Sequence, residues 1–186
     1  MNFFDASLDV KARAVPVMLG LGSNCSFDGK SSLELLKSAC LCLAQRISNI
    51  KYSSVYKTAA MYYENQPDFY NMVVSGFFKG SPFELLDFIQ KIEFSHGRNR
   101  AAEFRNGPRS MDIDIEFFGR ETVSSSSLQI PHPRFHERAF VLIPMLEIFP
   151  SNAEVFNIER DYLEQCLAKL SNQEVQKLPL LLGEGR

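Results

Sequence analysis

Apolar residues recur along the chain with two spacings, one typical of buried strands and the other of amphipathic helices. Short apolar or alternating runs bounded by glycine, serine or other polar residues predict four strands, over residues 15–22, 50–57, 72–78 and 111–118. Apolar residues at helical spacing follow Ser31 and Ser81, and a glutamate stands three residues after each serine. This capping-box pattern marks the start of a helix, so the predicted order is strand, helix, strand, strand, helix, strand.

That order is the split βαβ, or ferredoxin-like, unit, and it predicts an α+β fold with a βαββαβ core. We expect a largely antiparallel four-stranded sheet with both helices on one face. A Ser-rich turn at 124–127, an apolar segment at 140–148 and a helix near 159–170 are expected as C-terminal additions. Pro144 should bend or end any helix in the apolar segment, because it lacks a backbone N–H.

The length of 186 residues fits one domain, which we place at 15–150, after an N-terminal extension at 1–14. Residues 151–186 are expected to form a helical segment that packs on this domain or trails it. No apolar run approaches the ~20 residues that a membrane span needs, and the start of the chain lacks a secretory signal pattern. A formal net charge of −2 argues against a general nucleic-acid or membrane-surface binder. Four cysteines without a C-x-x-C pair indicate reduced thiols in a cytoplasmic protein.

The last predicted strand carries an unusual row of acidic residues. Side chains alternate along a strand, so Asp112, Asp114 and Glu116 should share one face. The other face would carry the apolar residues Ile113, Ile115 and Phe117. Carboxylates ~7 Å apart resist joint ionisation unless a cation neutralises them, and Mg²⁺ prefers such oxygen ligands. Two of them could hold a pair of ions, although a solvated acidic face explains the pattern equally well when it is considered alone.

An arginine-rich segment directly precedes this strand. Its four arginines are separated by glycine and proline, which favour a loop: Arg98, Arg100, Arg105 and Arg109. The ordinary interpretation of such a segment is a solvated basic loop. Guanidinium groups bind phosphate oxygens in a bidentate way, however, and a long loop can close as a lid. Next to an acidic strand, the arginines favour a polyphosphate site.

Two further clusters have residues suited to a ligand. Phe69 could stack on a flat heterocycle and Asn71 could bind its edge, since an amide both donates and accepts. Turn chemistry explains the residues just before this pair but not the pair itself. In the proline-rich segment 131–138, His132 and Arg138 could contact phosphate, although a structural hydrogen bond explains His132 slightly better on local grounds.

These motifs occur together and in order, and the chain resembles the 6-hydroxymethyl-7,8-dihydropterin pyrophosphokinases, enzymes of folate biosynthesis. The resemblance spans roughly 15–150, and its most specific part is the G-P-R-x-x-D-x-D run. The matching segments are 21–24, 56–58, 66–71, 90–93, 97–100, 107–114, 130–134 and 138–142.

The resemblance implies that ATP and 6-hydroxymethyl-7,8-dihydropterin are the substrates, and that AMP and the pterin diphosphate are the products. It implies two Mg²⁺ ions and a ferredoxin-like fold. The net charge already leads us to expect no nucleic-acid or membrane partner. It also leaves room for association with other enzymes of the folate pathway. The resemblance therefore describes an ATP-dependent diphosphotransferase.

Individual roles follow from the resemblance, position by position. Asp112 and Asp114 would ligate the metal ions and, with Arg98 and Arg109, form the catalytic set. The pterin would contact Thr58, Phe69, Asn71, Asp112 and Phe140, with its ring between the two phenylalanines. The ATP site would be lined by Gln90, Glu93, Arg98, Arg109, His132 and Arg138. Some members have a lysine at Ala101 and a tryptophan near 104–106, so no lid contact beyond the arginines is transferred.

Two other interpretations predict different behaviour. A ferredoxin-like RNA-binding module would use the arginine loop, but the acidic strand would repel a phosphate backbone and the aromatic RNP pattern is absent. A pterin-binding protein without catalysis would not need Asp112, Asp114 and Arg98, which are all present. Formation of AMP separates the diphosphotransferase from both.

Overall fold

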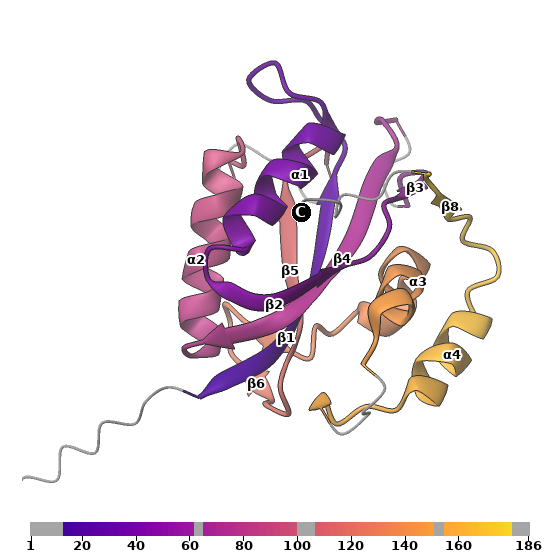
Figure 1. Ribbon diagram of the computed structural model, residues 1–186. Coiled ribbons are helices and arrows are strands. Elements are labelled where there is room, and N and C mark those ends of the chain that lie inside the picture. The colour runs from indigo at the N-terminus through magenta and orange to yellow at the C-terminus, as the bar shows by residue number, and fades with distance from the viewer. Residues whose placement is uncertain (1–12, 62–64, 100–106, 151–154, 180–186) are drawn as a thin grey trace, which may run out of the picture.

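A computed structural model of the chain describes residues 13–61, 65–99, 107–150 and 155–179. Its described residues form an antiparallel sheet with helices on both faces (Figure 1). The elements up to the last long strand are β1 (Ala14–Ser23), α1 (Ser32–Leu43), β2 (Ile47–Tyr52), β3 (Tyr56–Thr58), β4 (Phe69–Lys79), α2 (Pro82–Ser95) and β5 (Asp112–Phe118). After them come β6 (Val123–Ser124), β7 (Gln129–Ile130), the 3₁₀ helix η1 (Phe135–Glu137), α3 (Ala139–Ile148), α4 (Arg160–Ala168) and β8 (Gln176–Lys177).

Both predicted capping boxes are present, and they explain where α1 and α2 begin. The Ser31 hydroxyl accepts from the backbone N–H of Glu34, and the Glu34 carboxylate accepts from the backbone N–H of Ser31 at 2.8 Å. Ser81 and Glu84 make the same pair of bonds at the start of α2. Two orphan N–H groups of each helix are thereby satisfied by residues three positions apart.

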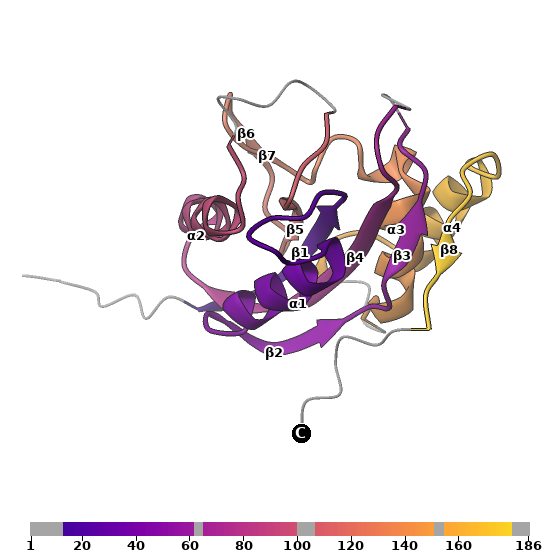
Figure 2. The ribbon, with the colours of Figure 1, turned by 90° about the horizontal axis from the view of Figure 1, so that it is seen from above.

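The ferredoxin-like arrangement is confirmed. β1 lies between β5 and β4 and pairs with both antiparallel, and β2 and β3 both pair with β4. Figures 1 and 2 show α1 and α2 on one face of the sheet, as predicted, and α3 and α4 on the other. The C-terminal strand β8 extends the sheet beyond β3.

The single strand predicted over 50–57 is wrong, because the structure has two strands there. Between them, the Ser53 side chain takes the place of a backbone acceptor: its hydroxyl accepts from the backbone N–H of Val73 on β4 at 2.9 Å. Next to it, the backbone N–H of Ser54 donates to the Glu147 carboxylate on α3 at 2.8 Å. Side-chain and helix contacts therefore interrupt a segment whose residue types favour a continuous strand.

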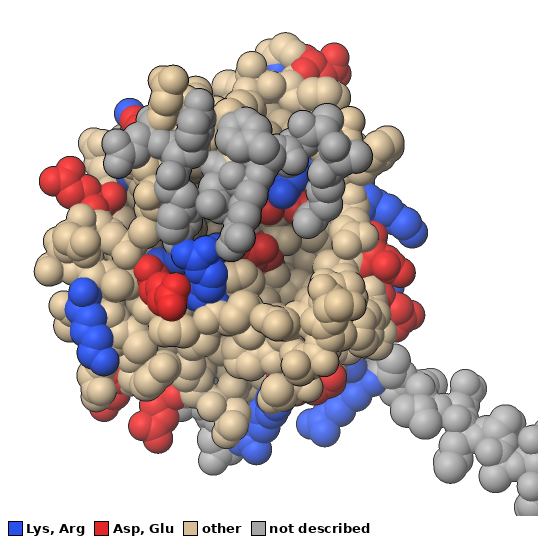
Figure 3. Space-filling view, turned by 180° about the vertical axis from the view of Figure 1, so that it is seen from behind, with Lys and Arg blue, Asp and Glu red and all other residues tan. Residues whose placement is uncertain are grey.

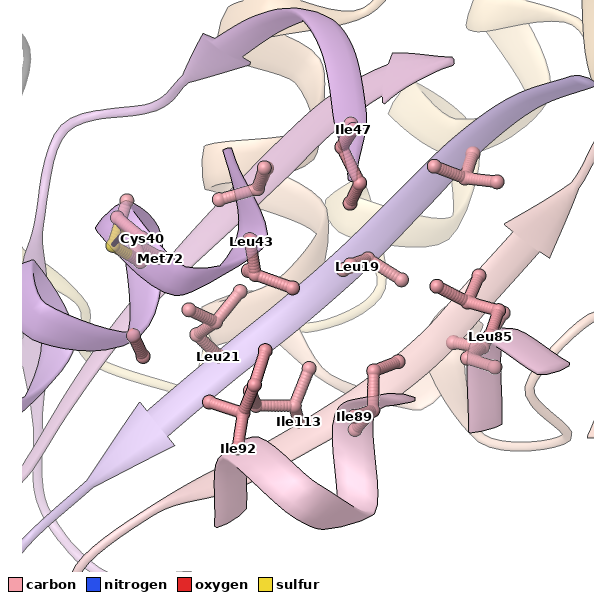
Figure 4. Close-up of a cluster of buried hydrophobic side chains, with 14 of the residues drawn as sticks. Leu19, Leu21, Cys40, Leu43, Ile47, Met72, Leu85, Ile89, Ile92 and Ile113 are labelled. Atoms are coloured by element: carbon pink, nitrogen blue, oxygen red, sulfur yellow. Dashed lines mark hydrogen bonds between the residues drawn. The ribbon is translucent and has the colours of Figure 1, made fainter. Parts of the chain in front are cut away.

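Two hydrophobic cores cover the two faces of the sheet. The first joins the sheet to α1 and α2 and includes Leu19, Leu43 and Ile89, which are all fully buried (Figure 4). The second joins the sheet to α3 and α4 and includes Met18 and Leu142. The sheet is thus buried on both sides, and polar groups on the α3 side lie at the edge of a packed core.

β5 contains a bulge that changes which side chains share a face. Its register with β1 shifts where Leu19 pairs with Ile115 and Met18 pairs with Phe117, so that Glu116 is an extra residue. Phe117 therefore packs in the core below α3, whereas Ile115 packs in the core below α1 and α2. The prediction that Phe117 shares a face with Ile113 and Ile115 is wrong for this reason.

The C-terminal additions contain two helices, α3 and α4, and the strand β8, which was not predicted. α3 continues to Ile148, so Pro144 does not end the helix. Four apolar residues of this helix are buried besides Pro144, and their packing offsets the missing N–H: Ala139, Val141, Leu142 and Met145. α4 lies within the predicted 159–170 segment. No helix in the described ranges has the length and apolar character needed to cross a membrane.

Candidate active site

A pocket lies on the α3 face of the sheet, and two glycines of β1 form its floor. A Cβ at Gly20 would lie 2.7 Å from Glu116 Oε1, and a Cβ at Gly22 would lie 3.1 Å from Asn71 Oδ1. Both glycines therefore leave room for a polar side chain of a neighbouring strand. This role was not predicted from the sequence, although glycines inside a strand often mark such close approach.

The residues predicted to bind a pterin all line this one pocket: Thr58, Phe69, Asn71, Asp112 and Phe140. Thr58 and Asn71 are buried, and the Asn71 amide donates to the Thr58 hydroxyl oxygen at 2.9 Å. Asn71 Oδ1 is left as an acceptor and the Thr58 hydroxyl hydrogen as a donor. Such a pair is complementary to the edge of a heterocycle that has both acceptor and donor nitrogens.

Asp112 is bound by two arginines. Arg98 Nη1 donates to Oδ1 at 2.6 Å, and Arg109 Nη1 donates to Oδ2 at 2.5 Å. Burial alone would raise the pKa of Asp112, but the charges of Arg109 and Arg98 outweigh it, so the pKa lies below its usual value. Each carboxylate oxygen of Asp112 therefore has a cationic partner, and the group is ionised.

The pKa values of Asp114 and Glu116 are raised, in contrast to that of Asp112. Burial, followed by the negative charge of Asp112, raises the pKa of Asp114 to about 6, although Arg138 donates to it at 3.2 Å. Glu116 is fully buried, and neither of its oxygens has a hydrogen-bond partner among the described residues. Burial, followed by the charge of Asp114, raises its pKa well above the usual value. The pocket thus has an excess of carboxylates that a cation would relieve.

His132 is held in one neutral form beside these carboxylates. The backbone N–H of Arg134 donates to His132 Nδ1 at 3.2 Å, so that Nε2 carries the ring hydrogen. Nε2 lies 3.9 Å from Asp114 Oδ2. Burial, followed by the charge of Arg138, lowers the pKa of His132 to about 4. At neutral pH this ring is an uncharged donor next to Asp114, which itself lines the pocket.

Four residues predicted for the ATP site do not line this pocket: Gln90, Glu93, Arg98 and His132. The buried Glu93 accepts from the backbone N–H of Ile113 at 2.9 Å and lies 3.7 Å from Arg98 Nη1. It therefore positions β5 and Arg98 rather than lining the pocket. Gln90 is exposed on α2, and the structure does not bring it to the pocket. Arg100 and Arg105 lie outside the described residues.

Asn24 connects two loops that carry site residues, a role that local sequence patterns did not reveal. Its amide nitrogen donates to Gln66 Oε1 and to the carbonyl of Pro67, both at 3.0 Å. Its amide oxygen accepts from the backbone N–H of Arg109 at 2.7 Å. The loop before Phe69 and the loop that carries Arg109 are therefore fixed to each other.

The carboxylates of Asp112 and Asp114 suit a metal ion whose other ligands are water and substrate phosphates. No group of three or more His, Cys, Asp or Glu side chains in the described ranges is placed to hold a metal ion. Asp112 and Asp114 nevertheless offer two carboxylates on one face of β5. Mg²⁺ commonly takes one or two carboxylates and completes its coordination with water and substrate phosphates. The donor set therefore suits magnesium bound together with a phosphorylated substrate.

Comparison with known proteins identifies the family. Residues 18–150 match the family model described as 7,8-dihydro-6-hydroxymethylpterin-pyrophosphokinase (HPPK). The chain belongs to the HPPK family. The predicted resemblance is confirmed, and the HPPK match covers all the site residues described above.

Two curated relatives are named 2-amino-4-hydroxy-6-hydroxymethyldihydropteridine pyrophosphokinase. The Bacillus subtilis protein is 48% identical over 98 residues, which are 53% of this chain and 58% of that protein. The Haemophilus influenzae protein is 31% identical over 165 residues, which are 84% of this chain and 99% of that protein. The first match thus spans less than two thirds of its relative.

A solved structure supports the fold. The structure described as Plasmodium falciparum HPPK-DHPS wild type with pteroate has a TM-score of 0.62 and 16% sequence identity. The match covers 86% of this chain and 45% of that chain. At this level of identity the similarity establishes the HPPK fold, and the site depends on the residues described above.

Proposed function

We propose that this HPPK-family chain transfers the terminal diphosphate of ATP to the hydroxymethyl group of 6-hydroxymethyl-7,8-dihydropterin, with AMP and the pterin diphosphate as products. The observation that carries the proposal is one pocket in which Asp112, Asp114 and Arg109 lie beside Asn71 and Phe140. A polyphosphate-binding group and a heterocycle-binding group are thus adjacent. That adjacency suits transfer of a phosphoryl chain to a hydroxyl on a flat ring.

Asp112 and Asp114 would hold two Mg²⁺ ions, which supply charge neutralisation of the ATP phosphates when bound. Arg98 and Arg109 now occupy both oxygens of Asp112. A cation on Asp112 would replace them as its counter-charge and leave their guanidinium groups to bind phosphate oxygens. The same arginines would therefore be available to the nucleotide phosphates only when ATP arrives with its metal.

The pterin ring would lie between Phe69 and Phe140, with Asn71 and Thr58 at its edge. Asn71 Oδ1 would accept from a ring N–H or amino group, and the Thr58 hydroxyl would donate to a ring nitrogen or oxygen. His132 would donate through Nε2 to a phosphate oxygen, since its Nδ1 is already occupied. Positioning and charge stabilisation carry most of the rate of phosphoryl transfer, so no side chain is assigned as a strong base.

Product analysis tests this proposal. The protein is incubated with ATP, Mg²⁺ and 6-hydroxymethyl-7,8-dihydropterin, and the products are separated by chromatography. We expect AMP and the pterin diphosphate in equal amounts, and chelation of Mg²⁺ should stop both. ADP as the nucleotide product, or turnover that persists in chelator, would contradict it.

Two broader aspects also belong to the proposal. Association with other folate-pathway enzymes is compatible with the fused HPPK-DHPS description of the Plasmodium chain, of which this chain matches 45%. A cytoplasmic location is supported by Cys40, Cys42 and Cys166, which form no disulfide among the described residues. An RNA-binding role is disfavoured, because Figure 3 shows acidic and basic side chains interspersed, with no continuous basic patch among the described residues of that face.

A further inference from the structure

The C-terminal segment 155–179 lies outside the region matched by the family model, yet it contacts two walls of the pocket. Its helix α4 packs against α3, which carries Phe140, in the second core. Its strand β8 pairs with β3, which carries Thr58, in the register Tyr56 to Lys177. Figure 2 shows α4 and β8 beside α3 and β3.

One side chain of this segment reaches the start of α3. Gln173 lies between α4 and β8; its Oε1 accepts from the backbone N–H of Ala139 at 2.8 Å. Its Nε2 donates to the carbonyl of Glu137 at 2.9 Å. The two bonds are made to the residues immediately before and after Arg138. A single amide therefore fixes the main chain on both sides of this arginine.

This contact also gives the first backbone N–H of α3 an acceptor. Arg138 is the N-cap residue of the helix, and its side chain makes no capping hydrogen bond. The first N–H groups of a helix need an acceptor, which serine, threonine, aspartate or asparagine at the N-cap usually supplies. The Arg138 guanidinium cannot serve as that acceptor because it only donates, and it reaches Asp114 at 3.2 Å instead. Gln173 supplies the missing acceptor from a distant segment.

The other end of α3 is attached to the same segment. Lys177 Nζ lies 2.9 Å from Glu147 Oε1, and the Glu147 carboxylate also accepts from the Ser54 hydroxyl at 2.7 Å and the Tyr56 hydroxyl at 3.0 Å. The backbone N–H of Leu178 donates to the carbonyl of Val55 at 2.9 Å. The helix that presents Phe140 is thus held at both ends by residues that lie after the family-model region.

We propose that Gln173 is a positioning residue for this pocket: it holds residues 137–139 so that Arg138 and Phe140 face the substrates. The inference rests on the proposed function, because it assigns those two side chains to ATP and pterin. It also means that residues 155–179 help to set the geometry of the active site. Gln173 itself touches neither the pocket nor the reacting groups.

The test compares three variants of the full chain. Gln173→Met keeps a side chain of similar length and removes both hydrogen bonds. Gln173→Glu keeps an acceptor for the Ala139 N–H and removes the donor to Glu137. Gln176→Met is the matched control, since Gln176 is exposed on the same segment. Pterin dissociation constants are measured by calorimetry, kcat and KM by AMP formation, and folding by thermal melting.

Gln173→Met should raise the Kd for pterin and lower kcat/KM by about three- to tenfold, the effect expected when displacement of Arg138 and Phe140 weakens about one contact with the substrates. Gln173→Glu should recover part of the loss, and Gln176→Met should match the wild type. Affinities and rates are compared at a temperature at which thermal melting shows each variant to be folded. A merely structural role would lower the melting temperature and leave pterin affinity unchanged in the folded protein.

Unchanged pterin affinity and kcat/KM in Gln173→Met would overturn the inference, as would an equal loss in Gln176→Met. If Gln173→Met does not fold, pterin affinity and kcat/KM are compared between Gln173→Glu and wild type. A loss of both would support the role of Gln173, and unchanged values would overturn it. A wild-type protein that binds pterin but forms no AMP would contradict the proposed function, and the binding data would still decide the role of Gln173.

Discussion

Asp112 and Asp114 lie two residues apart on β5, but replacement of each by asparagine should have opposite effects on stability. Asp112 neutralises Arg98 and Arg109, whose side chains are only 10% and 19% exposed. Asp112→Asn removes that counter-charge and should lower the free energy of unfolding by about 3 kcal/mol, the lower end for a broken buried pair. The lower end applies because the Asp112 side chain is 23% exposed.

Asp114→Asn should instead stabilise the metal-free protein. Burial and the charge of Asp112 raise the pKa of Asp114 from 3.8 to about 6, so its ionisation opposes folding. A raised folded pKa means that stability is greatest below the unfolded pKa and falls as the pH rises through the folded one. At neutral pH the gain should be roughly 1 kcal/mol, because solvent screens this partly exposed group. The difference from wild type should grow between about pH 4 and pH 6 and then level off.

Urea unfolding followed by circular dichroism, in chelator at about pH 4 and about pH 7.5, measures both effects. AMP formation is assayed in parallel, and both variants should lose it because both carboxylates are proposed to hold Mg²⁺. An Asp114→Asn protein that is destabilised as much as Asp112→Asn would refute the electrostatic reasoning. So would a stability difference that does not change with pH.

Three further predictions concern ligands. Phe140→Ala should weaken pterin binding by ~1–3 kcal/mol in calorimetry, as for a lost base-stacking contact, and unchanged affinity would remove this ring from the pocket. Gly22→Ala places a Cβ 3.1 Å from Asn71 Oδ1, so the amide must shift. Pterin affinity should fall about tenfold with ATP affinity unchanged, and equal losses of both would argue against this geometry. Mg²⁺ affinity should decrease as the pH falls through about 6, because Asp114 then binds a proton, and pH-independent affinity would contradict that assignment.

Much of the fold could be predicted because its signals are local. Ser31 and Glu34 lie three residues apart, and the capping box that they form does not depend on the rest of the chain. The bulge at Glu116 could not be predicted, because strict alternation continues through the sequence and only the pairing with β1 shows the extra residue. The break after β2 depends likewise on Glu147, which is distant in the sequence.

The residues of the site also fall into those that could be predicted from the sequence and those that could not. Motif residues such as Asp112 and Asn71 were predicted from side-chain chemistry and resemblance, and the structure brings them to one pocket. Gln90 was predicted for the same site but is exposed outside the pocket. Asn24 and Gln173 act through hydrogen bonds to distant backbone groups, and neither residue type nor spacing predicts such contacts.

The measurement that tests the central claim most directly follows the β-phosphoryl group of ATP. The protein is incubated with Mg²⁺, 6-hydroxymethyl-7,8-dihydropterin and ATP that carries a label in the β-phosphoryl group, and the products are separated. Transfer of diphosphate to a pterin in this pocket predicts that the label appears in the pterin product and that the AMP is unlabelled. Label that remains in the nucleotide as ADP would mean that only the γ-phosphoryl group moves, and it would contradict the account.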